Sequence, residues 1–339
     1  MFHYQSLFRK HAGGEAGKII SLTILAGVMM AASFFAVLMI VMLPMFAMGD
    51  GAWAVLYALI TFFLMLLFSF FIIYPLCIGI IKFFTSAYAD ESYGFSDLFF
   101  AFKAGRYGKA VKLTVLVIIA YLVINFVISM LMQVVLAVIN MPLTAALGGL
   151  SYEGLEPSAA LVTGQLGLFI LMVTINLLAV FVMYVPFLLL MVYMLLVYLV
   201  FVDQPHIPTF DKFTIAFKVM FQAGQSLVKL FFSNVLLLIG VTVLQIIAVI
   251  SAALIGSLML GAADSGVLFV LTLLAAGFII LAVHIYVMYV IVGSVVAYYF
   301  EGRHELDLRA AREMSHISGR GVGYEDHPDD LEPLGERNQ

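Results

Sequence analysis

The sequence predicts an all-α polytopic membrane protein. Its six transmembrane helices are expected to form three parallel hairpin repeats, with amphipathic interfacial helices on the cytoplasmic side. Three observations support this. The 339 residues are 64% hydrophobic and only 11% charged, unlike soluble domains. Six long stretches lack Lys, Arg, Asp and Glu, and all 16 Lys and Arg residues fall in four clusters outside them.

Each of the six apolar stretches exceeds the about 20 residues that an α-helix needs to cross the hydrocarbon layer. The fourth is long enough for two spans, but no polar turn divides it and only Pro186 interrupts it. We therefore expect one long helix there, tilted or kinked at the proline. Pro75 lies in the second span in a similar way. The stretches cover about residues 19–48, 53–81, 113–141, 159–202, 230–261 and 267–300.

The basic clusters set the expected orientation. An even number of spans places both termini and every basic residue on one face, which the positive-inside rule assigns to the cytoplasm. The other three connections carry only Asp50, Glu153, Glu156 and Asp264 as charged residues. The first span is too long for a cleavable signal and has no convincing cleavage site, so the N-terminus is also expected in the cytoplasm.

Four segments lie outside or beside the spans. Residues 1–18 are predicted to form a cytoplasmic amphipathic segment ahead of the transmembrane domain at 19–300. Residues 301–318 predict a short cytoplasmic helix, and residues 319–339 are Gly/Pro-rich and acidic, which predicts disorder.

Two short amphipathic helices, about 95–104 and 210–221, are expected to lie in the interface because they are too short and too charged to span the membrane. At 100° per residue, each places an aromatic stripe on one face. The stripes contain Phe95, Leu98, Phe99 and Phe102 in the first helix, and Phe210, Phe213, Phe217, Met220 and Phe221 in the second.

After the first short helix the chain is expected to turn at Gly105 to Gly108 and enter the membrane near Lys112. The basic residues of this turn would lie at headgroup level, where each contributes about 1 kcal/mol of attraction to an anionic leaflet. They can either fix topology by snorkelling or bind a lipid or partner. The binding hypothesis names Phe99, Phe102, Lys103, Arg106, Lys109, Lys112, Phe217 and Lys218.

Internal similarity predicts a repeated unit. Residues 4–25 laid on 95–116 match at eight of 22 positions, including Gly14 with Gly105 and Lys18 with Lys109. The order of interfacial helix, outgoing span, short turn and returning span recurs three times, which indicates parallel repeats around an axis along the membrane normal.

The spans contain no charge at their centres, but they do contain neutral polar side chains. His284 could sense protons or contact a substrate, or it could simply bond to a neighbouring helix. The amides could join helices or line a solute pathway. The set is Asn125, Asn176, Asn234, Gln245 and His284.

Catalytic signatures are absent from the sequence. Cys77 is the single cysteine, and the seven histidines lack ligand spacing. No P-loop, His-Glu-x-x-His or Gly-x-Ser-x-Gly occurs. We expect no enzyme activity, no cofactor and no metal. Expected partners are membrane lipids, a membrane protein or a second copy of the chain, and not nucleic acid.

The segment at 74–113 joins Pro75-Leu76-x-x-Gly79, an acidic turn and a phenylalanine-striped helix. It resembles a group of uncharacterised bacterial six-helix membrane proteins, which are similar to the membrane domain fused to some glycerophosphodiester phosphodiesterases. The second copy departs from the pattern and reads Pro186-Phe-Leu-Leu. The resemblance implies the six-helix fold and a bacterial inner membrane, and it carries over no catalytic residue.

Two functions follow as hypotheses. The first is a non-enzymatic scaffold or accessory protein of the inner membrane that engages lipid headgroups or a membrane partner through its cytoplasmic amphipathic helices. The alternative is a transporter or permease subunit for an apolar or amphipathic solute. An axis between the hairpins that is open rather than filled would favour the alternative.

Overall fold

A computed structural model describes residues 2–44, 51–149, 159–259 and 266–320, and all its regular elements in these ranges are helical. The expected number of spans is confirmed, because six helices in the described ranges are long and apolar enough to cross a membrane. In the first part of the chain the elements are α1 (His3–Ala12), the short 3-10 turn η1 (Gly13–Glu15), α2 (Ala16–Met42), α4 (Ala52–Phe68), the π-helical turn η2 (Ser69–Ile73) and α5 (Tyr74–Tyr88). They continue with the 3-10 helix η3 (Phe95–Phe102), α6 (Tyr107–Gly149), α7 (Ala159–Asp203), α8 (Thr209–Phe221), α9 (Leu227–Met259) and α10 (Gly266–Arg320).

Prolines in or directly after three of the apolar stretches have different effects. Helix α7 runs unbroken through Pro186, as predicted. The second span is instead divided into α4 and α5 by the π-helical turn η2, and Pro75 lies in the first turn of α5. A widened turn accommodates a proline, which lacks an N–H and crowds the carbonyl four residues earlier. Helix α6 extends through Pro142 to Gly149, so part of the predicted connection at 142–158 is helical.

The end of the chain differs from expectation. Residues 301–318 are helical, but they continue α10 without a break to Arg320. The sequence from Glu301 to Arg320 contains no proline, so nothing stops the helix as it leaves the apolar stretch. The predicted disordered tail at 319–339 lies outside the described residues from 321 onward.

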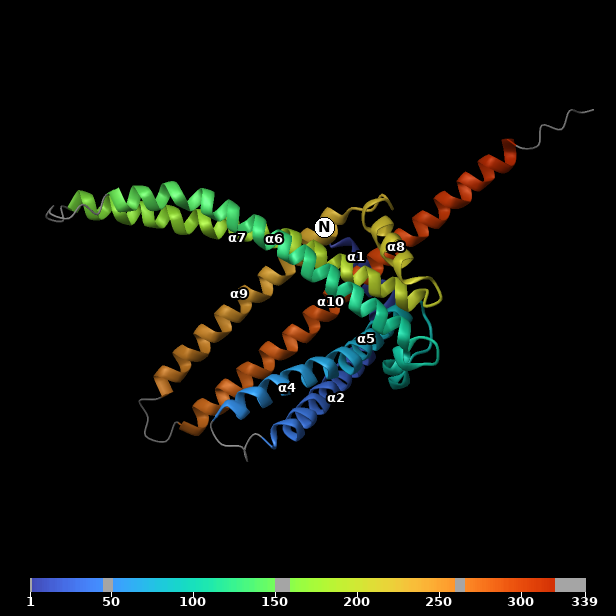
Figure 1. Ribbon diagram of the computed structural model, residues 1–339, viewed down its shortest axis with the longest axis horizontal. Helices are drawn as coiled ribbons and strands as arrows, with labels where there is room; N and C mark the ends of the chain where they lie inside the picture. Colours follow the sequence, from blue (N-terminus) through green and yellow to red (C-terminus); the bar gives the residue numbers. More distant parts are fainter. Residues whose placement is uncertain (1, 45–50, 150–158, 260–265, 321–339) are drawn as a thin grey trace, which may run out of the picture.

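One end of the molecule is a packed base. We define the base as α1, η3 and α8 together with the adjoining ends of α5, α7, α9 and α10 (residues 74–88, 190–203, 227–234 and 289–303). Helices α5, α7 and α10 contact one another pairwise there, and α1 packs against α10 and α5. Most residues of 196–202 and all of 293–299 are buried. Figure 1 shows α1 and α8 beside the point where the long helices converge.

Glycines allow the short helices to pack closely in the base. A Cβ atom on Gly79 of α5 would overlap the backbone of Leu98 in η3, and one on Gly293 of α10 would overlap the ring of Phe8 in α1. Gly79 belongs to the Pro-Leu-x-x-Gly motif of the predicted resemblance. The glycine of that motif therefore permits backbone-to-backbone contact between α5 and η3.

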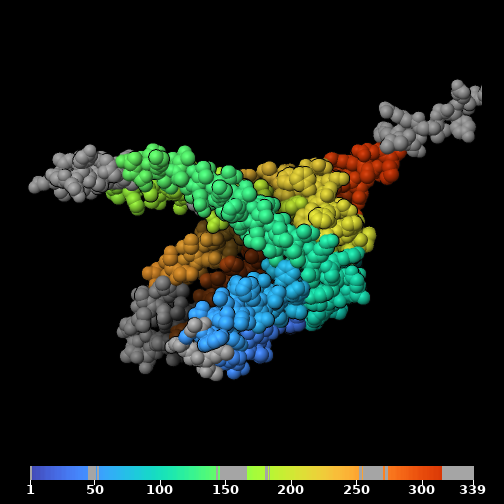
Figure 2. Space-filling view, in the orientation of Figure 1, coloured from blue at the N-terminus to red at the C-terminus, as the bar shows by residue number. Residues whose placement is uncertain are grey.

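Away from the base the long helices diverge in pairs. Consecutive long helices lie in contact as α2 with α4, α6 with α7, and α9 with α10. Figure 2 shows an open space between the α6–α7 pair and the other two pairs. Large apolar side chains face outward on all three pairs, among them Trp53, Phe126 and Phe278, each at least 70% exposed.

Candidate functional site

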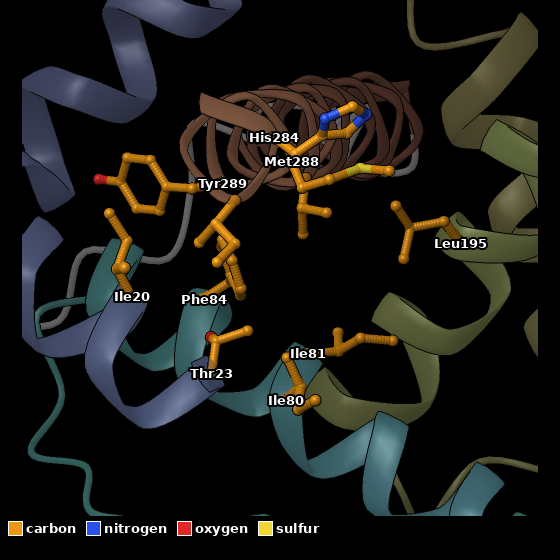
Figure 3. A pocket seen from close by; sticks show the side chains of 11 residues that line it. Ile20, Thr23, Ile80, Ile81, Phe84, Leu195, His284, Met288 and Tyr289 are labelled. Atoms are coloured by element: carbon orange, nitrogen blue, oxygen red, sulfur yellow. The ribbon is translucent and has the colours of Figure 1, made fainter. Parts of the chain in front are cut away.

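One candidate site is a cavity where the three helix pairs begin to separate. It has a volume of about 270 Å³ and an almost entirely apolar lining from α2, α5, α7 and α10. Each helix pair therefore contributes at least one wall. Figure 3 shows Met288 of α10, Leu195 of α7 and Ile81 of α5 around the cavity. The lining residues are Ile20, Thr23, Ile80, Ile81, Phe84, Leu195, His284, Ile285, Met288, Tyr289 and Val292.

The polar groups of this cavity lie at its margins. In Figure 3 the Tyr289 side chain directs its hydroxyl away from the middle of the cavity. Thr23 Oγ1 is buried, and no hydrogen-bond partner is present for it among the described residues. The cavity wall holds no carboxylate and no lysine or arginine. Such a lining favours an apolar occupant and disfavours a buried charge.

His284 lines the outer side of the cavity and is joined to the neighbouring helix. The Gln245 amide Nε2 on α9 lies 2.6 Å from His284 Nδ1 on α10. Two of the predicted polar residues thus form one interhelical contact. This geometry matches the interpretation of His284 as a histidine bonded to a neighbouring helix.

The remaining predicted polar residues are not gathered into one site. Asn176 on α7 exchanges two amide hydrogen bonds with Asn140 on α6, at 2.9 and 2.7 Å. Asn125 accepts a bond from Ser129 within the same helix. Asn140 was missed by the sequence reasoning, although its place next to Pro142 near the end of an apolar stretch could have drawn attention to it.

Asn234 belongs to a buried network in the base. Its Nδ2 donates to Ser294 Oγ on α10 at 3.0 Å, and its Oδ1 accepts from Gln5 Nε2 on α1 at 2.8 Å. Gln5 Nε2 also donates to Ser233 Oγ. All four side chains are buried. The network ties α1, α9 and α10 together, and the role of Gln5 could not be seen from a segment expected to lie in the interface.

The basic cluster that follows η3 is largely engaged within the protein. Lys103 pairs with Asp97 at 3.3 Å, and the Arg106 guanidinium lies over the Phe100 ring at 4.4 Å. The Lys109 amine lies 3.5 Å from the backbone carbonyl oxygens of residues 205 and 206. Lys112 and Lys218 are exposed. The hypothesis that these cations bind a lipid or partner is thus weakest for the first three.

The turn after η3 has the predicted position. Gly105 adopts a φ of 75°, in the left-handed region that glycine tolerates without strain. Helix α6 then begins at Tyr107, whose ring stacks on Phe102.

The aromatic stripe of η3 is divided between two directions, which corrects the expected single face. Leu98 is fully buried against the base, whereas Phe95 and Phe99 are exposed. η3 is wound as a 3-10 helix with a kink at Phe99, so the 100° periodicity that predicted a single face does not apply to it.

Helix α8 divides its stripe in the same way. Phe210, Phe217 and Phe221 are exposed, and Met220 is buried in the base. Phe213 is partly buried, and its carbonyl accepts a hydrogen bond from the Tyr193 hydroxyl on α7 at 3.1 Å. The exposed phenylalanines therefore form narrower stripes than predicted.

Charged contacts in the base were not foreseen. The Asp203 carboxylate at the end of α7 pairs with Arg303 of α10 and accepts a 2.8 Å hydrogen bond from the Tyr299 hydroxyl. Lys212 of α8 is buried and donates to the backbone carbonyl of Ile207. Burial, and then the positive charge of Lys109, lower the pKa of the Lys212 amine to about 8. The acidic residue at the end of each returning span was the available signal for the Asp203 pair.

Within the described ranges, no three His, Cys, Asp or Glu side chains lie close enough together to hold a metal ion. The geometry of the described residues therefore offers an apolar cavity between the helix pairs and exposed aromatic stripes beside the base. No protein-family model matches the chain, and neither the curated proteins nor the solved structures contain a match to it.

Proposed function

We propose that the chain is a non-enzymatic, multi-pass protein of a bacterial inner membrane that accommodates an apolar or amphipathic molecule between its helix pairs, as a transporter or permease subunit. The supporting observation is the apolar cavity, whose walls come from all three pairs. In this proposal the pairs are three parallel hairpin repeats, and the base and both termini face the cytoplasm.

The size of the cavity suggests which part of a molecule it holds. Its volume of about 270 Å³ lies just below the range of roughly 300–1,000 Å³ that is common for small-molecule sites. It exceeds the roughly 150 Å³ cavity that binds benzene in an engineered protein core. A segment of an acyl chain or a small ring system fits this space, with any polar group of the ligand left outside.

The apolar molecule would enter sideways from the bilayer. Met288 lines the cavity and is 55% exposed, so the cavity is open to its surroundings at that side chain. In a membrane, lipid chains would surround this opening. The lining supplies no carboxylate for proton or sodium coupling, so the proposal does not include an ion gradient.

A cavity-filling variant tests this proposal. Leu195→Trp replaces a leucine of the cavity wall with the larger indole ring, whereas Leu122→Trp makes the same replacement at an exposed site on α6. We expect purified protein to bind the apolar dye N-phenyl-1-naphthylamine, and we expect Leu195→Trp to lower this binding at least tenfold. Equal binding by wild type and both variants would refute the cavity as the site.

A second candidate role is the lipid- or partner-engaging scaffold. It is favoured by the exposed Phe95, Phe99, Phe210, Phe217 and Phe221 on η3 and α8. Lys218 is exposed on the same helix as the three α8 rings, a combination that suits the headgroup region of a leaflet. Replacing the three α8 phenylalanines with serine should then release a membrane partner captured by crosslinking in cells, while the fold remains intact. Unchanged capture would exclude this role.

A further inference from the structure

A second cavity lies on the base, and its lining is polar. It has a volume of about 450 Å³ and is formed by α1, the loop between α8 and α9, the first turn of α9, and α10. It is separate from the apolar cavity, and the two share no lining residue. Its lining residues are His3, Tyr4, Ala223, Gly224, Gln225, Ser226, Lys229, Glu301, Glu305 and Arg309.

The charges of this polar cavity are mixed. Lys229 and Arg309 supply positive charge, and Glu301 and Glu305 supply negative charge. A simple anion would meet two carboxylates, and a simple cation would meet an ammonium and a guanidinium. A ligand that carries both signs would satisfy both sets. A metal ion is a poor candidate, since no three-ligand cluster exists within the described ranges.

The cavity also contains unused hydrogen-bonding capacity. His3 Nε2 lies 3.4 Å from Glu301 Oε1, but Glu301 Oε2 is without a partner among the described residues. Gln225 has neither of its amide atoms hydrogen-bonded there. These atoms are buried in the walls, so a ligand in the cavity reaches them only when the two side chains rotate. Unpaired buried polar atoms are costly, and a ligand that supplies donors to Glu301 and an acceptor to Gln225 favours that rotation.

The loop that carries Gln225 has a fixed shape. Gly224 has a φ of 78°, in the left-handed region that favours glycine. Arg309 donates from α10 to the carbonyl oxygens of Gln222 at 2.8 Å and Ala223 at 3.3 Å. The loop is thus clamped to α10, and one wall of the cavity is set before a ligand binds.

The position of the cavity points to a lipid. Lys229 lies in the first turn of α9, which is a candidate span. Val228 and Phe232 on the same part of α9 are exposed. A headgroup beside Lys229 would leave its acyl chains next to these apolar side chains.

We propose that the cavity formed by His3, Gln225, Lys229, Glu301, Glu305 and Arg309 binds a phosphoethanolamine group. The primary ammonium of the ligand donates to Glu301 and Glu305, and its phosphate accepts from Lys229 and the Gln225 amide. A quaternary choline ammonium has no N–H donor and cannot make the first set of bonds. The group comes either from phosphatidylethanolamine or from the free compound.

The test uses the purified full chain and native mass spectrometry. Protein is equilibrated with equal amounts of phosphatidylethanolamine and phosphatidylcholine of the same acyl chains, and separately with free O-phosphoethanolamine. We expect one phosphatidylethanolamine to be retained in preference to phosphatidylcholine. Lys229→Gln and Glu301→Gln should each weaken retention about tenfold, the usual size of a lost charged hydrogen bond. Lys10→Gln removes an exposed cation outside the cavity lining and should change nothing.

Each result of this test has a defined meaning. Retention of the lipid alone identifies the lipid as the source, and binding of free O-phosphoethanolamine alone identifies the soluble compound. Equal retention of the two lipids without binding of the free compound overturns the proposal. So does a loss confined to Glu301→Gln that is accompanied by a lowered melting temperature, because Lys229 is exposed and its replacement leaves the fold intact.

Discussion

The base and the outer halves of the helix pairs are held together differently. In the base, helices from all three pairs touch, and buried side chains of the short helices fill the gaps, among them Phe8 of α1, Phe100 of η3 and Met220 of α8. In the outer halves each helix touches mainly its own partner. The α6–α7 and α9–α10 pairs are each joined there by a side-chain contact, Asn140 with Asn176 and Gln245 with His284.

The difference shows what close helix packing requires in a membrane. Lipid chains are as apolar as leucine, so burial alone does not drive helices together there. Close packing in the base depends on shape, provided by Gly79 beneath Leu98 and Gly293 beneath Phe8. The outer halves lack such contacts with other pairs and diverge. The apolar cavity lies where the packed base ends and the helix pairs begin to separate.

The base is most sensitive at Gly79. A leucine at this position would overlap the backbone of η3, which cannot yield as a side chain can. We expect Gly79→Leu to destabilise the protein by about 3 kcal/mol or more, and to displace η3. Thermal unfolding in detergent and proteolysis at the turn after Phe102 would detect this. Gly167→Leu, at an open position on α7, is the matched control.

The polar network of the base should have the next largest effect. Asn234→Leu leaves one N–H of the Gln5 amide without its acceptor and Ser294 Oγ without its donor, while the bonds of Gln5 to Ser233 and of Ser294 to the Ile291 carbonyl remain. An unpaired buried group costs about 1–3 kcal/mol, so we expect a loss of about 2 kcal/mol. Thermal melting of the single variant and of Asn234→Leu with Gln5→Leu would measure it. A double variant that is less stable than the single one would contradict the network.

Lys212 makes the stability of the base depend on pH. Its pKa is about 8 in the fold against 10.5 when unperturbed, so between these values the unfolded chain binds more protons and stability rises with pH. We expect wild type to gain at most about 1.4 kcal/mol per pH unit over that range relative to Lys212→Met. Melting temperatures of both proteins at pH 7 and pH 9.5 test this, and a constant difference between them would rule it out.

The outer contacts should matter least. Asn176→Leu removes the reciprocal amide bonds to Asn140 between α6 and α7. Side-chain hydrogen bonds between membrane helices contribute on average about 0.6 kcal/mol. We expect a loss of that order, well below the effect of Asn234→Leu. Melting curves of the two variants would show this ranking. A larger loss of stability for Asn176→Leu than for Asn234→Leu would contradict the difference between the base and the outer halves.

Much of the architecture could be predicted because it depends on local signals. Long uncharged stretches gave the six spans, and the unbroken helix at Pro186 followed from the absence of a polar turn. The glycine turn at Gly105 was also visible. The winding of η3 could not be predicted, because it depends on the contact with Gly79, a residue sixteen positions before Phe95.

The candidate site was less predictable than the fold. Polar residues in apolar stretches were easy to identify, but most of their partners lie on other helices. The contact between Gln5 and Asn234 joins distant parts of the chain and has no local sequence signal. The apolar cavity has no signature at all, because Leu195, Ile81 and Met288 look like any other apolar residue. Its existence depends on the angle between helix pairs, which is set by the whole base.

Fluorescence quenching inside the cavity is the direct test of whether apolar chains enter it from the bilayer. Trp53 is the single tryptophan, and Trp53→Phe makes a silent background for Phe84→Trp, which lines the cavity, and Phe83→Trp, which is buried in the base outside the cavity lining. These neighbours lie at nearly the same depth. We expect brominated fatty acid in the bilayer to quench the tryptophan at position 84 strongly and the one at position 83 weakly. Equal quenching at both positions would contradict it.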